Sequence, residues 1–307
     1  MADGAHSAGA MRMREWAFPA PAVRREVLRA EPGASMSPDD RWADRADRDA
    51  STRPPLLFVH ALGHAAWSWE EWLPAAADAG WSAHAVSLRA HGGSEGRSRF
   101  ARIRMAEYEH DVLQEASRLP RPPVVIAHSF GCVVATRVAA RYPFAAVVLL
   151  APVGVDHALD VVPHLLRRGP AHVARVATLR PLRLRPVDLF AGLEPHEQDA
   201  YVERLDPEPP LVQLQLLLRR PPAPPVGDPP VLVYGAELDA LVPAGGVERT
   251  ARFLGTRARW LPGIGHDVML DRGNRAVLGR VLGDLEEALG LSDTGDGDAA
   301  QRADAGR

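Results

Sequence analysis

The sequence predicts an α/β fold, in which a mostly parallel central sheet is flanked by helices and carries a helical cap insertion. Three observations lead to this prediction. Short apolar runs alternate with helical segments from residue 56 to residue 151, the alternation stops between residues 154 and 226, and two further apolar runs follow. Short buried strands that alternate with helices are typical of βαβ units, in which helices cover both faces of a parallel sheet.

The segments before residue 56 differ from this pattern. Residues 13–18 and 23–29 are expected as two antiparallel strands, because a Pro-Ala-Pro turn separates two short apolar runs. Residues 31–55 are expected as a charged loop with prolines at both ends. We expect disordered ends at residues 1–12 and 291–307, because small polar residues without periodicity cannot bury enough apolar surface to order them.

From residue 56 onward the expected elements are regular. The apolar runs expected as strands lie at 56–60, 82–88, 124–128, 145–151, 231–235 and 258–262. The helical patterns lie at 67–80, 105–119, 131–142 and 272–290. Residues 13–154 and 227–290 are therefore expected to form the two parts of one core. Residues 155–226 contain helical segments but no good buried strand and end in a Pro-rich connector, so we expect a helical cap or lid inserted into that core.

Composition narrows the class of protein. The chain has 307 residues, 46% of them hydrophobic, and a formal net charge of −3, so it lacks the basic surface that nucleic-acid binding requires. No segment approaches the roughly 18 to 20 apolar residues that span a bilayer, and the N-terminus has no apolar signal core. The single cysteine, Cys132, excludes an internal disulfide and suits a reducing compartment. We expect a cytoplasmic protein with no nucleic-acid partner and no membrane span; nothing in the sequence specifies an oligomer.

The stretch VVIAHSFGCVVA changes its period at Ser129. A strand that runs into a helix through one tight turn places this serine at the carboxyl end of a central parallel strand, where α/β sheets bind their ligands. A sharp turn needs small residues two positions on either side, and Ala127 and Gly131 supply them. The pattern A-x-S-x-G is a one-methyl variant of the G-x-S-x-G nucleophile elbow. The alternative is that Ser129 only caps the helix.

On this motif and its strand-to-helix context, the chain resembles the α/β-hydrolase superfamily from residue 13 to residue 290. The resemblance implies a catalytic triad in the chain order Ser, acid, His. Asp239, in a loop after an apolar strand, and His266, in a Gly-flanked loop before the last helix, stand at the implied positions. Asp156 is the alternative acid, because some members of the superfamily hold the carboxylate at that earlier strand end.

These residue types suit nucleophilic catalysis. Serine is a poor nucleophile at neutral pH unless a base lies within hydrogen-bonding reach. A neutral His266 would accept the proton of Ser129, and Asp239 would fix the tautomer of the imidazole and stabilise the imidazolium.

The resemblance also implies two backbone N–H donors for an oxyanion, from Phe130 after the nucleophile and from Leu62 after the strand 56–60. Ala61 and Ala127 stand where the family usually has glycine. If the backbone at Ala61 needs a positive φ, an alanine would be strained there. The turn at 86–96 resembles the family's Arg-Gly-His-Gly turn, again with alanine at a usual glycine, and is expected to support the site.

The function that the resemblance implies is a serine hydrolase of the carboxylesterase or lysophospholipase-like branch. It would cleave a small or medium acyl ester, thioester or lactone through an acyl-enzyme, with no cofactor and no metal. Acyltransferase and perhydrolase activities use the same triad, and a non-catalytic ligand-binding protein of this fold is the other alternative. Four histidines near the site are expected to pack or hydrogen bond around it rather than bind a metal: His60, His64, His91 and His128.

Overall fold

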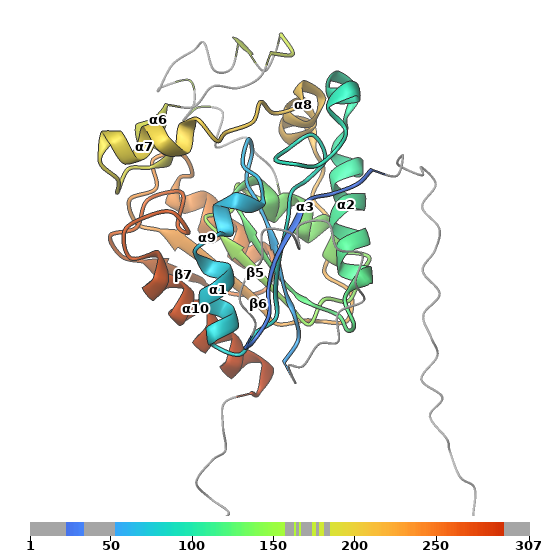
Figure 1. Cartoon of the computed structure of the whole chain (residues 1–307), viewed down its shortest axis with the longest axis vertical. Helices are drawn as coiled ribbons and strands as arrows, with labels where there is room; N and C mark the ends of the chain where they lie inside the picture. The colour runs from blue at the N-terminus through green and yellow to red at the C-terminus, as the bar shows by residue number, and fades with distance from the viewer. Residues whose placement is uncertain are drawn as a thin grey trace, which may run out of the picture.

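A seven-stranded sheet forms the core of the computed structural model of this chain (Figure 1). The structure describes residues 23–33, 53–156 and 185–291, and, in the segment between the last two ranges, residues 163, 166, 174, 175 and 178–180. The strand order is β1-β3-β2-β4-β5-β6-β7. β1 runs antiparallel to β3, and every other pair of neighbours is parallel. The prediction of a mostly parallel α/β sheet is therefore confirmed.

The strands lie close to the predicted apolar runs. Their bounds are β1 (Val27–Ala30), β2 (Leu56–Val59), β3 (Ala83–Val86), β4 (Val124–His128), β5 (Ala146–Leu150), β6 (Val231–Ala236) and β7 (Ala258–Leu261). Every residue of β2, β3, β4 and β5 is buried, as expected for central parallel strands that are covered on both faces. The first strand begins later than predicted, at Val27 rather than residue 23, and its antiparallel partner is β3.

Helices cover both faces of this sheet (Figure 1). α1 and α10 pack together, and α2 and α3 pack together, while α9 contacts β6 and β7. The bounds in the core are η2 (Ala66–Trp69), α1 (Trp72–Asp78), η3 (Arg97–Arg102), α2 (Met105–Arg118), α3 (Phe130–Ala139), α9 (Ala244–Phe253) and α10 (Asn274–Leu289). α2 is amphipathic, since its buried apolar residues recur at helical spacing, for example at Met105, Tyr108 and Val112.

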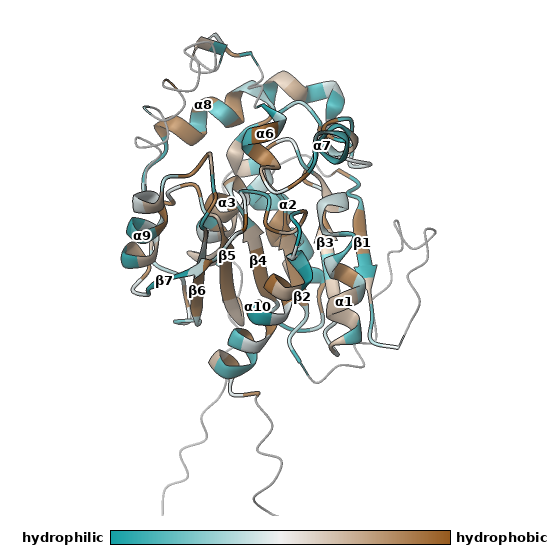
Figure 2. Ribbon diagram, turned by 90° about the vertical axis from the view of Figure 1, so that its left-hand side faces the viewer, coloured by the Kyte–Doolittle hydropathy of each residue, from teal (hydrophilic) through white to brown (hydrophobic). Residues whose placement is uncertain are grey.

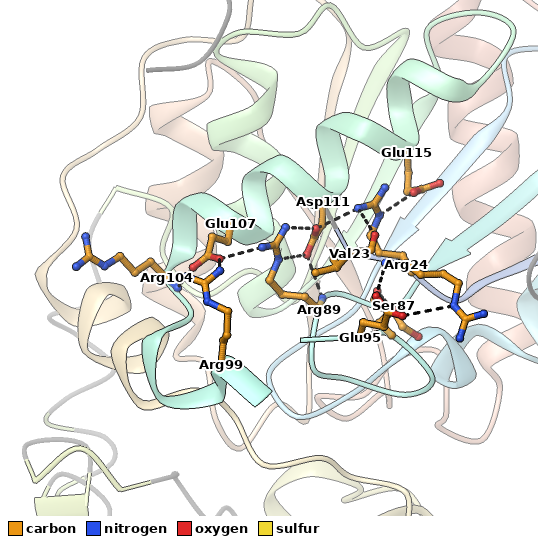
Figure 3. A network of polar contacts seen from close by, with 12 residues as sticks. Val23, Arg24, Ser87, Arg89, Glu95, Arg99, Arg104, Glu107, Asp111 and Glu115 are labelled. Carbon is orange, nitrogen blue, oxygen red and sulfur yellow. Dashed lines mark hydrogen bonds and ion pairs between the residues drawn. The ribbon is translucent and has the colours of Figure 1, made fainter. Parts of the chain in front are cut away.

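A buried ion-pair network joins the edge strand and the 86–96 turn to α2 (Figure 3). Arg89 donates two hydrogen bonds to Asp111 from its side chain, at 2.9 and 2.6 Å, and a third to Glu107 at 2.9 Å. Arg25, just before β1, pairs with Glu115 at 2.7 Å and with Asp111 at 3.4 Å. Because breaking such buried pairs leaves an uncompensated charge, the network holds the turn in one position beside the ends of the strands.

Three helices that follow β5 in the chain lie above the carboxyl edge of the sheet (Figure 2). They are α6 (Pro186–Leu189), α7 (Pro195–Val202) and α8 (Pro210–Leu218). The apolar strands lie below them in Figure 2, so the helices overhang the end of the sheet where the predicted site residues are found. The predicted limits of the cap, 155 and 226, stay a prediction.

Several expectations concern residues outside the described part. The strand at 13–18, most of the loop at 31–55 and the two expected disordered ends belong to this group, apart from Leu291. Within the described part, no helix combines the length and the apolar character needed to cross a membrane.

Candidate active site

The turn between β4 and α3 places Ser129 in an unusual backbone conformation. Its φ and ψ are 52° and −114°, a region that L-residues avoid because of steric crowding. Gly131 is required here, because an added Cβ would lie 2.6 Å from the carbonyl oxygen of His60 and 2.7 Å from that of Val59. Ser129 occupies the N-cap position of α3, but its side chain makes no capping hydrogen bond in the described structure. The turn therefore presents the hydroxyl to another partner.

That partner is His266, in the loop after β7. The Oγ of Ser129 lies 2.9 Å from Nε2 of His266, and Nδ1 of His266 lies 2.8 Å from Oδ2 of Asp239. Nδ1–H can donate to the carboxylate while Nε2 accepts from the hydroxyl, so one tautomer satisfies both contacts. The structure thus joins three predicted side chains from three separate loops in one chain of hydrogen bonds.

Asp239 is itself held in place. Its Oδ1 accepts hydrogen bonds from the N–H groups of Leu241 and Val242, at 2.7 and 2.8 Å, which leaves Oδ2 for the imidazole. The alternative acid, Asp156, accepts a hydrogen bond from Arg249 at 3.0 Å. Nδ1 of His266 is therefore bonded to Asp239 and not to Asp156.

The surroundings shift the pKa of His266 upward. Burial lowers the pKa of this imidazole, but the charge of Asp239, its hydrogen bond and the charge of Asp267 outweigh burial. A higher pKa makes an imidazole a stronger acceptor for the serine proton. It also means that a higher pH is needed before the imidazole is neutral and able to accept that proton.

Leu62 belongs to the loop after β2, and Phe130 belongs to the elbow itself. Phe130 is the first residue of α3, and Leu62 follows β2, whose last residues contact Gly131. The strain considered for Ala61 does not arise, because Ala61 is not among the described residues with positive φ. The left-handed residue of this loop is Gly63, with φ of 73°.

A carboxylate that the sequence did not predict lies against this loop. Glu208, which precedes α8, accepts a hydrogen bond from the N–H of Gly63 at 2.9 Å and one from the hydroxyl of Tyr108 at 2.8 Å. Nε2 of His91 lies 3.2 Å from Glu208. Burial lowers the pKa of His91, but the charge of Glu208 and the contact with it outweigh burial and raise the pKa above its ordinary value.

Residues 56–280, well over half of the chain, match the model of the alpha/beta hydrolase family. The chain belongs to this family.

Solved structures share the fold of this alpha/beta hydrolase. A thermophilic esterase is 21% identical with a TM-score of 0.57, over 78% of this chain and 92% of the esterase. The monoacylglycerol lipase of Paleococcus ferrophilus is 18% identical with a TM-score of 0.55, over 75% of this chain and 96% of the lipase. A carboxylesterase structure from Nitrososphaera gargenis is 16% identical with a TM-score of 0.62, over 90% of this chain and 98% of the other. No curated protein matches the sequence.

The alpha/beta hydrolase has a second buried acid next to its candidate base. Asp267 directly follows His266, and its carboxylate faces His64 and His128. In the described structure, ligand atoms of His128, His266 and Asp267 lie within 4.8 Å of one another. Both ring nitrogens of His266 are already hydrogen bonded, so an ion could not use this group without breaking the contacts to Asp239 and Ser129.

Proposed function

We propose that this alpha/beta hydrolase is a serine hydrolase that cleaves a small or medium acyl ester, thioester or lactone through an acyl-enzyme. One observation carries the proposal: His266 lies 2.9 Å from the Oγ of Ser129 on one side and 2.8 Å from Asp239 on the other. This is the arrangement that nucleophile, base and orienting acid require.

In the proposed reaction, the Oγ of Ser129 attacks the acyl carbonyl while its proton passes to Nε2 of His266. The tetrahedral intermediate collapses, and the leaving alcohol or thiol takes that proton, which leaves an acyl group on Ser129. A water molecule then gives a proton to His266 and attacks the acyl group. Collapse of the second intermediate releases the acid and returns the proton to Ser129. Asp239 stays ionised and stabilises the imidazolium in both halves.

The proposed oxyanion donors are the backbone N–H groups of Leu62 and Phe130. Removing one donor of this kind typically costs about 10² to 10³ in rate. Their placement is supported by the close contact between the end of β2 and Gly131, which fixes the loop after β2 against the elbow.

The ester substrate class is supported by the neighbours in fold, which are described as an esterase, a monoacylglycerol lipase and carboxylesterases. Acyl transfer and perhydrolysis would use the same residues with a different acceptor for the acyl group. Product analysis therefore decides among them: an acid and an alcohol from a panel of esters of increasing acyl-chain length would support hydrolysis.

Labelling with a fluorophosphonate probe tests the nucleophile. We expect the wild type to be labelled at Ser129 and the Ser129→Ala variant to stay unlabelled. Ser117→Ala is the matched control, because the hydroxyl of Ser117 donates within α2, to the carbonyl of Leu113 at 2.8 Å, and its loss should leave labelling unchanged. A folded wild type that is not labelled would overturn the proposal and favour a ligand-binding protein of this fold.

A further inference from the structure

Asp267 lies where three loops of the proposed site meet. Its side chain is 1% exposed, its Oδ2 lies 3.4 Å from Nε2 of His64, and its Oδ1 lies 3.6 Å from Nδ1 of His128. Each of these three residues lies within two positions of a proposed catalytic group in the chain. His64 is two residues after Leu62, His128 directly precedes Ser129, and Asp267 directly follows His266. The cluster therefore connects the oxyanion loop, the elbow and the base loop.

The tautomers of the two imidazoles follow from their other contacts. Nδ1 of His64 lies 2.9 Å from the carbonyl oxygen of Leu62, and Nε2 of His128 lies 2.9 Å from the carbonyl oxygen of His266. A carbonyl oxygen only accepts, so both of these nitrogens carry a hydrogen. In neutral imidazoles the nitrogens that face Asp267 would then be bare lone pairs.

Two lone pairs facing an ionised carboxylate would be repulsive and would leave buried polar atoms without partners. In the described structure, neither oxygen of Asp267 accepts a hydrogen bond. The nitrogens that face it, Nε2 of His64 and Nδ1 of His128, have no hydrogen-bond partner there either. One additional proton relieves one of the two contacts, because it turns one of the imidazoles into a cation beside the carboxylate.

His64 is the better holder of that proton. Its nitrogen lies nearer to the carboxylate, at 3.4 Å against 3.6 Å for His128. The ring of Trp67 stacks on His64 with centroids 5.4 Å apart and planes at 25°, an arrangement that stabilises a cation. Burial lowers the pKa of His128 to about 3, which keeps that ring neutral.

We propose that Asp267 is a positioning residue, and that its pairing with a proton on Nε2 of His64 ties the loop of Leu62 to the loop of His266. The proposal rests on the proposed function, since the two loops matter for catalysis only if His266 is the base. The backbone N–H of Asp267 also donates to the carbonyl of Leu189 in α6, at 3.3 Å, so the same residue fastens the overhanging helices to the site.

Four titratable groups surround Asp267. His64 and His128 come from other loops, and His266 and Asp271 come from its own loop. Burial raises the pKa of Asp267, but the charge of His64 and the contact with it, together with smaller effects of His128 and His266, outweigh burial and lower this pKa. The carboxylate in turn contributes to the raised pKa of His266. Removing Asp267 should therefore lower the pKa of the base, and removing only His64 should raise it.

The first test needs no activity. In full-length protein with ¹⁵N-labelled histidine at pH 7, NMR should show His64 with hydrogens on both nitrogens and His128 as the neutral Nε2–H tautomer. In Asp267→Asn, His64 should change to the neutral Nδ1–H form. A neutral His64 in the wild type would overturn the proposal, and this measurement is valid even if Ser129 proves unreactive.

The second test uses hydrolysis of p-nitrophenyl butyrate by Asp267→Asn, His64→Gln and the double variant. Each single variant should lose about 10² in kcat with a smaller change in KM, because loop placement affects the transition state most. The acid limb of the pH profile should move to lower pH in Asp267→Asn and to higher pH in His64→Gln. Asp284→Asn, which changes a carboxylate on α10 that pairs with Arg259, is the control and should match the wild type.

The double variant decides whether the two residues act together. If they act as a pair, it should lose no more activity than the worse single variant. Additive losses of about 10⁴ in total, or pH profiles that do not move, would overturn the positioning role. A wild type without labelling at Ser129 would instead refute the proposed function and leave the NMR result to decide on the pair.

Discussion

The carboxylate of Glu208 accepts a hydrogen bond from the N–H of Gly63, one residue beyond the proposed oxyanion donor Leu62, at 2.9 Å. The segment that follows α7 is thus bonded directly to the loop after β2. His91 and Tyr108 contact the same carboxylate, so a charge from the overhanging segment is buried among core residues. This contact predicts a link between stability and pH.

Glu208→Gln should destabilise the protein in a pH-dependent way. The pKa of His91 is raised in the folded protein, so the pair stabilises fully below the unfolded pKa of about 6.5. The stabilisation is lost as pH rises through the higher folded pKa. We expect the free energy of unfolding to fall by about 3 kcal/mol at pH 6 and by less at pH 9. Urea denaturation at both pH values measures this, with exposed Glu203→Gln as the control. A loss that is equal at both pH values would contradict the assignment to His91.

Asp239→Asn should reduce kcat/KM by about 10⁴, because the imidazole loses the acid that orients and stabilises it. Hydrolysis needs a neutral His266, whose pKa is raised chiefly by Asp239 against the effect of burial. Activity in the wild type should therefore rise with pH around a midpoint above about 6.5, and the residual activity of the variant should have its midpoint at lower pH. Asp156→Asn, which changes the carboxylate that pairs with Arg249, is the comparison. Equal and mild losses in both variants would remove Asp239 from the triad.

Local sequence patterns explain why much of this structure was predictable. Ser129 lies where a short, uninterrupted apolar run changes to a helical pattern, so the elbow can be recognised from a few neighbouring residues. Asp239 and His266 lie in short loops that directly follow strands, so the order of strands and helices along the chain is enough to predict where they lie. The buried runs of β2, β4 and β5 have no polar interruption, which makes their strands unambiguous.

The rest of the site could not be predicted, because it depends on contacts between segments that are distant in the sequence. Asp267 stands beside a predicted residue, but its significance depends on His64 and His128, which belong to other loops. Glu208 lies in a polar, Pro-rich stretch without periodicity, and nothing in that stretch shows that its carboxylate is buried. The need for a small residue at Gly131 was predicted from the sharpness of the turn, whereas the atoms that crowd it belong to Val59, the last residue of β2, and to His60 after it.

Gly131→Ala should destabilise the protein and slow labelling of Ser129. The added Cβ would lie 2.6 and 2.7 Å from two carbonyl oxygens of the backbone, which cannot rotate away. We expect a loss of about 3 kcal/mol in unfolding free energy. Gly279→Ala is the matched control: it lies inside α10 with open space around the Cβ position, and alanine should stabilise by about 0.5–1 kcal/mol there. Denaturant titrations of both variants test this, and equal effects would mean that the elbow yields to the methyl group.

Ala90→Gly and Ala61→Gly should change stability in opposite directions. Both alanines stand where the family usually has glycine, but only Ala90 has a positive φ, at 66°. Glycine at position 90 removes the clash of a left-handed Cβ and should stabilise by about 1 kcal/mol. At position 61 no such strain exists, so glycine only adds freedom to the unfolded chain and should destabilise by about 0.5–1 kcal/mol. Thermal unfolding of the two variants compares them directly, and stabilisation by Ala61→Gly would show that the loop of Leu62 is strained after all.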